Sequence, residues 1–144
     1  MSMQQPSLPN YLALTSGTTA GITNDCSPGV GCTVKAPSIT DQIEKSGRTE
    51  KIYAGSMPTP SLPNYVFIGP NLCNDTHECP VATGDDWPSR QVPAILASPA
   101  FTMQNSLLVI TWGEGEGANN CVSTIFAGPA ARWGYHSAPS IVRR

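Results

Sequence analysis

The stretch Ser7–Gly17, SLPNYLALTSG, decides the fold class that the sequence predicts. Its apolar run Tyr11–Leu14 stops at Thr-Ser-Gly, which predicts a short buried strand that ends in a tight turn. Ligands of open α/β sheets bind beyond the carboxyl ends of the strands, so Ser16 becomes the candidate nucleophile. Gly17 permits a backbone angle closed to other residues and lets a substrate approach Ser16. An ordinary turn without chemistry is the alternative interpretation.

Composition limits the class of protein. The 144 residues suit one domain spanning residues 1–144. A net charge of −2 argues against a nucleic-acid partner. No apolar run reaches the roughly 20 residues of a transmembrane segment. The polar start lacks the apolar core of a signal peptide, so we expect either a cytosolic protein or part of a longer secreted parent.

The five cysteines bear on the compartment. Cys26 and Cys32 enclose SPGVG, and Cys73 and Cys79 enclose NDTHE, so each pair is able to close a small disulfide loop in an oxidising compartment. Four cysteines allow three connectivities, and proximity in sequence favours 26–32 with 73–79. A zinc site is the weaker alternative, because zinc prefers more closely spaced pairs. We expect Cys121, which lies on an apolar run, to be a buried free thiol.

Further segments alternate between strand and helix patterns. The expected helices are 38–46 and 87–97, the second with a cap at 83–86, and the expected strands are 51–54, 65–68, 106–111 and 121–127. This alternation predicts an α/β fold with a mostly parallel sheet flanked by helices. The phrase SLPNY recurs at Ser61–Tyr65, either as a second equivalent strand or as a join between segments once separated.

Polar groups follow three of the expected strands. A hydroxyl, an imidazole and carboxylates at strand ends are the components of a hydrolase, here Ser16, the loop of Asn74, Asp75 and His77, and the loop of Glu114 and Glu116. Phosphoryl transfer fits such oxygen-rich loops, because carboxylates hold a divalent cation there. The alternatives are an exposed structural histidine and a solvated acidic turn.

Four phrases together resemble one family, the bacterial and fungal phosphoesterases. They are SLPNYLALTSGTTAGITNDC, LPNYVFIGPNLCNDTHEC, VPAILASPAFTMQNSLLVITWGEGEG and TIFAGPAAR. That family contains acid phosphatases and phosphatidylcholine-type phospholipases C and belongs to the alkaline-phosphatase-like superfamily. The resemblance implies a reduced alkaline-phosphatase-like core, a hydroxyl nucleophile, a divalent metal ion of unknown identity and a covalent phospho-enzyme.

Carried over by position, the resemblance assigns roles to several residues. Ser16 matches the nucleophile and His77 an active-site histidine. Beside these matches, we expect Asn74 and Gly17 to bind the substrate. Glu114 matches one of two acidic metal ligands, with Asp75 as a further candidate. The other acid is replaced by glycine, because TWGEG at Thr111–Gly115 stands where members usually have TWDEG.

The chain also departs from the family pattern. It starts after the Glu-Asn metal-binding motif of the family, and Ser56-Met57-Pro58 runs almost directly into Ser61. A missing internal stretch there would explain the SLPNY echo as a splice point. Fewer carboxylates would weaken the binding of a divalent ion and leave the Ser16 hydroxyl protonated.

These observations lead to three hypotheses. The first is a hydrolase of phosphate esters, acting on a small phosphate ester or a phospholipid head group with Ser16 and a divalent metal. The second is an impaired remnant that binds at most phosphate-like anions. The third is a metal-independent serine ester hydrolase, although the G-x-S-x-G elbow is absent. Apolar strands without neighbours would also favour a homo-oligomer.

Overall fold

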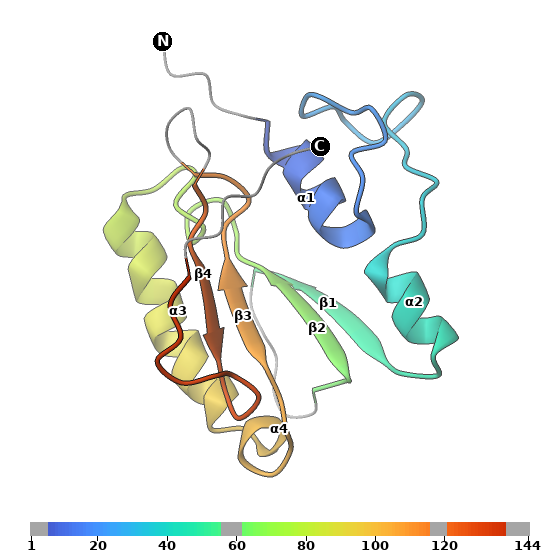
Figure 1. The fold of residues 1–144 in the computed structure, drawn as a ribbon. Coiled ribbons are helices and arrows are strands. Elements are labelled where there is room, and N and C mark those ends of the chain that lie inside the picture. Colours follow the sequence, from blue (N-terminus) through green and yellow to red (C-terminus); the bar gives the residue numbers. More distant parts are fainter. Residues whose placement is uncertain (1–5, 56–61, 116–120, 138–144) are drawn as a thin grey trace.

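The computed structural model describes residues 6–55, 62–115 and 121–137. Its elements run in the order α1 (Ser7–Ser16), α2 (Ile39–Lys45), β1 (Glu50–Ala54), β2 (Tyr65–Gly69), α3 (Val81–Leu96), α4 (Pro99–Thr102), β3 (Leu108–Thr111) and β4 (Thr124–Ala127). Helices and strands thus confirm the predicted α/β class. In Figure 1, α3 runs along the side that carries β3 and β4, while α1 and α2 lie on the side of β1 and β2.

The strands form two separate pairs within the described residues. β1 and β2 are parallel: Glu50 lies opposite Tyr65 at one end of the pair, and Ala54 lies opposite Gly69 at the other. β3 and β4 are antiparallel, with Leu108 opposite Ala127. The expectation of parallel pairing therefore holds for the first pair and is wrong for the second. The predicted strands 51–54 and 65–68 are confirmed to within a residue, and 106–111 and 121–127 prove two or three residues shorter.

The first apolar run is a helix and not the predicted strand. α1 covers Ser7–Ser16, and Gly17 ends it in the left-handed conformation at φ 73°, where its N–H donates to the carbonyl of Ala13 at 2.9 Å. Leu and Ala favour helix, and proline is tolerated in the first turn, as Pro9 is here. The Ser16 hydroxyl donates to the Leu12 carbonyl at 2.8 Å. A Gly after an apolar run marks a helix end as readily as a strand turn.

The two SLPNY phrases fold differently, so the hypothesis of two equivalent strands is wrong. The first phrase begins α1, whereas Tyr65 of the second begins β2. The residues that follow decide the outcome, because LAL favours helix and VFI favours strand. Asn64 fixes the entry to β2, since its side-chain oxygen accepts the backbone N–H of Thr49 at 3.2 Å.

The helix α2 forms as predicted, and α3 begins earlier than expected. Ser38 caps α2 in a capping box with Asp41, and the helix ends before Ser46. α3 starts at Val81, so the segment 83–86 lies inside it and is not its cap. Asp86 instead forms an ion pair with Arg90 one turn on.

The cysteines pair as proximity in sequence favoured. Disulfides join Cys26 to Cys32 and Cys73 to Cys79. Cys121 is free but exposed, so the expectation of a buried thiol is wrong. It precedes β4 instead of lying within it.

The interior of the described part is small. Among the described residues, Ile22 and Ile95 are the buried apolar side chains. No helix in this part of the chain is long and apolar enough to cross a membrane.

Candidate active site

The site assembles around the first residue of α1. The Ser7 hydroxyl donates to Glu114 Oε1 at 3.2 Å, across 107 positions of sequence. Glu114 lies in the loop that follows β3, so a helix start and a strand end meet here. The sequence predicted Glu114 as a site residue but missed Ser7, because the misassigned strand placed Ser7 at its entry and not at its active end.

One oxygen of the Glu114 carboxylate accepts a hydrogen bond, and the other has no partner among the described residues. Its Oε2 is buried and finds no hydrogen-bond partner among the described residues. A buried, unpaired carboxylate oxygen is costly, which indicates that a further group belongs there. A proton, a cation or a donor from a substrate would satisfy it.

Tyr11 lies one helical turn after Ser7 and faces the same acidic groups. Burial raises the pKa of the Tyr11 phenol, and the negative charges of Asp75 and then Glu114 raise this pKa further. Both predicted carboxylates therefore raise the pKa of one phenol, after its burial. A Cβ built at Gly113 would lie 3.8 Å from Tyr11 Cζ, an ordinary contact distance.

The start of α1 is itself a donor of hydrogen bonds to anions. The backbone N–H of Leu8 donates to Asp25 Oδ1 at 2.8 Å, although Asp25 comes from the loop next to the first disulfide. Unpaired N–H groups at a helix start carry partial positive charge and favour anions. At this helix start the Asp25 carboxylate already occupies the Leu8 N–H, and Pro9 has no N–H to offer.

The loop after β2 carries three predicted residues and is tightly tied down. The disulfide Cys73–Cys79 closes it, and Asp75 Oδ1 accepts the backbone N–H of His77 at 2.9 Å. Thr76 is at φ 74°, and a Cβ at Gly84 of α3 would lie 2.1 Å from Thr76 Cγ2. Only glycine at position 84 therefore lets the loop pack this closely on α3.

The other predicted residues belong to the end of α1 and to the loop after β2. Ser16 ends α1, so the expectation that it ends a strand is wrong. It lies nine residues after Ser7, which corresponds to about 14 Å along the helix axis. Gly17 serves as the C-cap of this helix. His77 is exposed, and the half-buried Asn74 donates its backbone N–H to the Asn71 carbonyl at 2.9 Å. Glu116 and the segment 56–61 lie outside the described residues.

The residues present fit a divalent metal only in part. Glu114 offers an unpaired carboxylate oxygen, and Ser7 offers a hydroxyl beside it. Hard cations such as Mg²⁺ bind through one or two carboxylates together with phosphate and water. The described part of the chain nevertheless contains no cluster of three or more Asp, Glu, His or Cys able to hold a metal ion.

Comparison with known proteins establishes the family. The model of the Phosphoesterase family matches residues 56–141, more than half of the chain. The chain therefore belongs to the Phosphoesterase family, as the sequence phrases predicted.

Three curated relatives carry phosphatase names. A phosphatidylinositol-3-phosphatase of Mycobacterium tuberculosis is 30% identical over 92% of this chain and 57% of its own length. A phosphate-repressible acid phosphatase of Penicillium chrysogenum is 36% identical over 39% of this chain and 13% of its own length. A probable acid phosphatase of Kluyveromyces lactis is 35% identical over 46% of this chain and 16% of its own length.

The chain spans little more than half of the mycobacterial relative and smaller shares of the other two. The alignment with the mycobacterial protein runs over 174 positions, more than the 144 residues of this chain. That relative therefore has residues without a counterpart here.

Proposed function

We propose that the protein hydrolyses phosphate esters with Ser7 as its nucleophile. The observation that carries the proposal is the Ser7 hydroxyl donating to Glu114 Oε1 at 3.2 Å, with Glu114 Oε2 buried and unpaired beside it. Membership of the Phosphoesterase family supports the reaction class. Ser16, the nucleophile that the sequence predicted, ranks second. Its hydroxyl donates to the carbonyls of Leu12 and Thr18 and not to an acid.

The chemistry follows from the groups that surround Ser7. Glu114 accepts the hydroxyl proton while Ser7 Oγ bonds to phosphorus and the bond from phosphorus to the ester oxygen breaks. The leaving oxygen takes a proton from solvent. Water then attacks phosphorus, the bond from phosphorus to Ser7 Oγ breaks, and Oγ takes back the proton held by Glu114 while phosphate leaves.

Glu114 and Ser7, with Asp75 nearby, would hold a divalent cation. When bound, such an ion lowers the pKa of the hydroxyl and neutralises charge on the phosphoryl oxygens. We assign His77 to the non-bridging oxygens and Asn74 to substrate contact, as the resemblance implies. The two disulfides support an oxidising compartment, and we extend the proposal to a secreted parent protein acting on small phosphate esters or phospholipid head groups.

A second function is favoured by one observation. Because the described residues hold no cluster of three metal-binding side chains, a chain that binds phosphate-like anions without turnover is the alternative. The two functions differ in whether phosphate is released. A metal-independent carboxyl-ester hydrolase would differ from both in its substrate.

Hydrolysis of p-nitrophenyl phosphate, with and without added magnesium or zinc, tests the proposal. We expect metal-stimulated release of nitrophenol, lost by at least about 100-fold in Glu114→Gln because both the proton acceptor and the charged ligand disappear. Gly113→Asp should raise the rate, since its Cβ has ordinary contact distance to Tyr11 and its carboxylate adds a ligand.

Two outcomes would contradict the hydrolase. No turnover in either the natural chain or Gly113→Asp would favour the anion-binding alternative. Cleavage of p-nitrophenyl acetate without metal, and no cleavage of the phosphate, would favour the carboxyl-ester hydrolase.

A further inference from the structure

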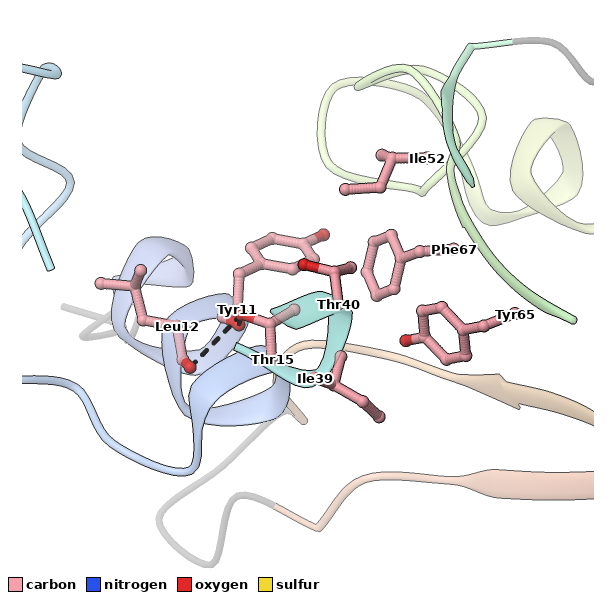
Figure 2. A pocket seen from close by; sticks show the side chains of 8 residues that line it. All are labelled: Tyr11, Leu12, Thr15, Ile39, Thr40, Ile52, Tyr65 and Phe67. Atoms are coloured by element: carbon pink, nitrogen blue, oxygen red, sulfur yellow. Dashed lines mark hydrogen bonds between the residues drawn. The ribbon is translucent and has the colours of Figure 1, made fainter. Parts of the chain in front are cut away.

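An apolar pocket lies next to the candidate site. It has a volume of about 170 Å³ and lies between α1, α2, β1 and β2. Figure 2 shows the Tyr11 ring from α1 directed toward the Phe67 ring of β2, with Ile39 and Thr40 of α2 beside them. Ile52 of β1 and Tyr65 of β2 complete this wall.

The pocket has little to offer a polar ligand. The Thr15 hydroxyl at its edge already donates to the Tyr11 carbonyl at 2.8 Å. The Thr40 hydroxyl is engaged with the Ser38 hydroxyl at 2.7 Å. The remaining lining is aliphatic and aromatic, so the pocket favours an apolar occupant.

The size of the pocket limits that occupant. An engineered apolar cavity of about 150 Å³ binds benzene. A pocket of about 170 Å³ therefore suits one aromatic ring or a short alkyl chain.

Tyr11 makes the pocket continuous with the site. It lies four residues after Ser7 on α1, so the two side chains share one helix face about 6 Å apart along the axis. Its ring lines the pocket, and its Cζ lies 3.8 Å from the Cβ position of Gly113, the residue before Glu114.

We propose that this pocket binds the apolar leaving group of the substrate, an aryl or short alkyl group on a phosphate ester. The inference rests on the proposed function, because it takes the phosphoryl group to lie at Ser7. It makes Tyr11, Phe67 and Ile52 determinants of specificity. It predicts a preference for aryl over methyl esters that comes from this pocket.

Binding of two phosphonates tests the inference without requiring turnover. Isothermal titration calorimetry of the full chain with phenylphosphonate and methylphosphonate, in magnesium buffer, should show phenylphosphonate binding about tenfold more tightly, the effect of partly burying a ring. Ile52→Asn should reduce this preference to about twofold, because Ile52 is 65% exposed and its replacement puts an amide at the pocket mouth without disturbing the interior.

The matched control is Leu14→Asn. Leu14 is an exposed apolar residue of α1 that does not line the pocket, and its replacement should leave the preference unchanged. Circular dichroism should confirm that both variants keep the fold.

Each outcome separates the pocket from the hydrolase. Equal binding of the two phosphonates would overturn the pocket and leave the hydrolase standing, as would a preference that survives Ile52→Asn. Preferred binding of phenylphosphonate, lost in Ile52→Asn, in a chain that turns over no ester would overturn the hydrolase and the leaving-group role, and would leave a pocket that only binds aryl groups. Binding of neither compound would overturn both.

Discussion

Tyr11 connects the candidate site to the apolar pocket, and its phenol reports on both. Burial is the largest cause of its raised pKa, and the charges of Asp75 and Glu114 add to it. The neutral phenol is therefore the favoured form in the folded chain. Any stability that this residue contributes is present below the ordinary tyrosine pKa and is lost as the pH rises through the raised value.

Removing the Glu114 charge should change this titration. In Glu114→Gln the pKa of Tyr11 should fall toward its ordinary value but stay above it, because burial and Asp75 remain. Ultraviolet difference titration at alkaline pH measures it, with Tyr11→Phe identifying the transition among the four tyrosines. An unchanged titration in Glu114→Gln would place Glu114 away from the phenol and contradict the site.

At the scale of elements, α2 has a well-defined beginning. The Ser38 hydroxyl accepts the Asp41 backbone N–H at 3.3 Å, and the Asp41 carboxylate accepts the Ser38 backbone N–H at 2.6 Å. That backbone bond, followed by the bond from the Ser38 hydroxyl, holds the pKa of Asp41 below its ordinary value. α2 contributes Ile39 and Thr40 to the apolar pocket, so its cap also positions the pocket wall.

Ser38→Ala should destabilise the chain by about 1 kcal/mol, the usual value of a helix N-cap. The pKa of Asp41 should rise at the same time, because the hydroxyl bond is lost while the backbone bond remains. The low pKa stabilises the fold above the ordinary aspartate value, and this stabilisation disappears as the pH falls through the folded value. Thermal unfolding measures the loss of stability, and an NMR titration measures the pKa of Asp41. Ser46→Ala, at the other end of α2, is the control. An unchanged pKa of Asp41 in Ser38→Ala would contradict the cap.

The sequence predicted correctly those elements whose local residue patterns fit one kind of secondary structure. It predicted wrongly where one pattern fits both a helix and a strand. The Ser-x-x-Asp box of α2 and the β-branched and aromatic run at Tyr65 have one interpretation each. The Tyr11–Leu14 run has two, because four apolar residues before a glycine fit a strand or a helix end equally well. Both disulfides were predicted from the spacing of the cysteines and are confirmed. Glu114 and Asp75 as metal ligands stay predictions. Ser7 was missed because its importance comes from a contact 107 positions away.

At the scale of the whole molecule, the chain exposes much surface. Among the described residues, several large apolar side chains are exposed, with Val30 and Trp133 the most exposed of them. The pair β3–β4 contributes to this surface, with Val109 47% and its partner Phe126 58% exposed. Apolar strands exposed in this way favour pairing with another chain.

We therefore expect the chain to self-associate as its concentration rises. Sedimentation velocity over a concentration range of about 5–200 μM, a range in which weak interfaces form, should show growing oligomers. Phe126→Lys should weaken the association, because it places a charge on the exposed strand, whereas Val30→Lys changes an exposed apolar residue outside the strands and should not. A natural chain that stays monomeric throughout would contradict this expectation.

The most direct test of the proposed site compares two serines of one helix. Initial rates of p-nitrophenyl phosphate hydrolysis should be measured for Ser7→Ala and Ser16→Ala, which remove the same hydroxyl from opposite ends of α1. If Ser7 is the nucleophile, Ser7→Ala abolishes phosphate release and Ser16→Ala keeps most of it. Activity that survives in Ser7→Ala and disappears in Ser16→Ala would contradict the site built around Ser7 and Glu114.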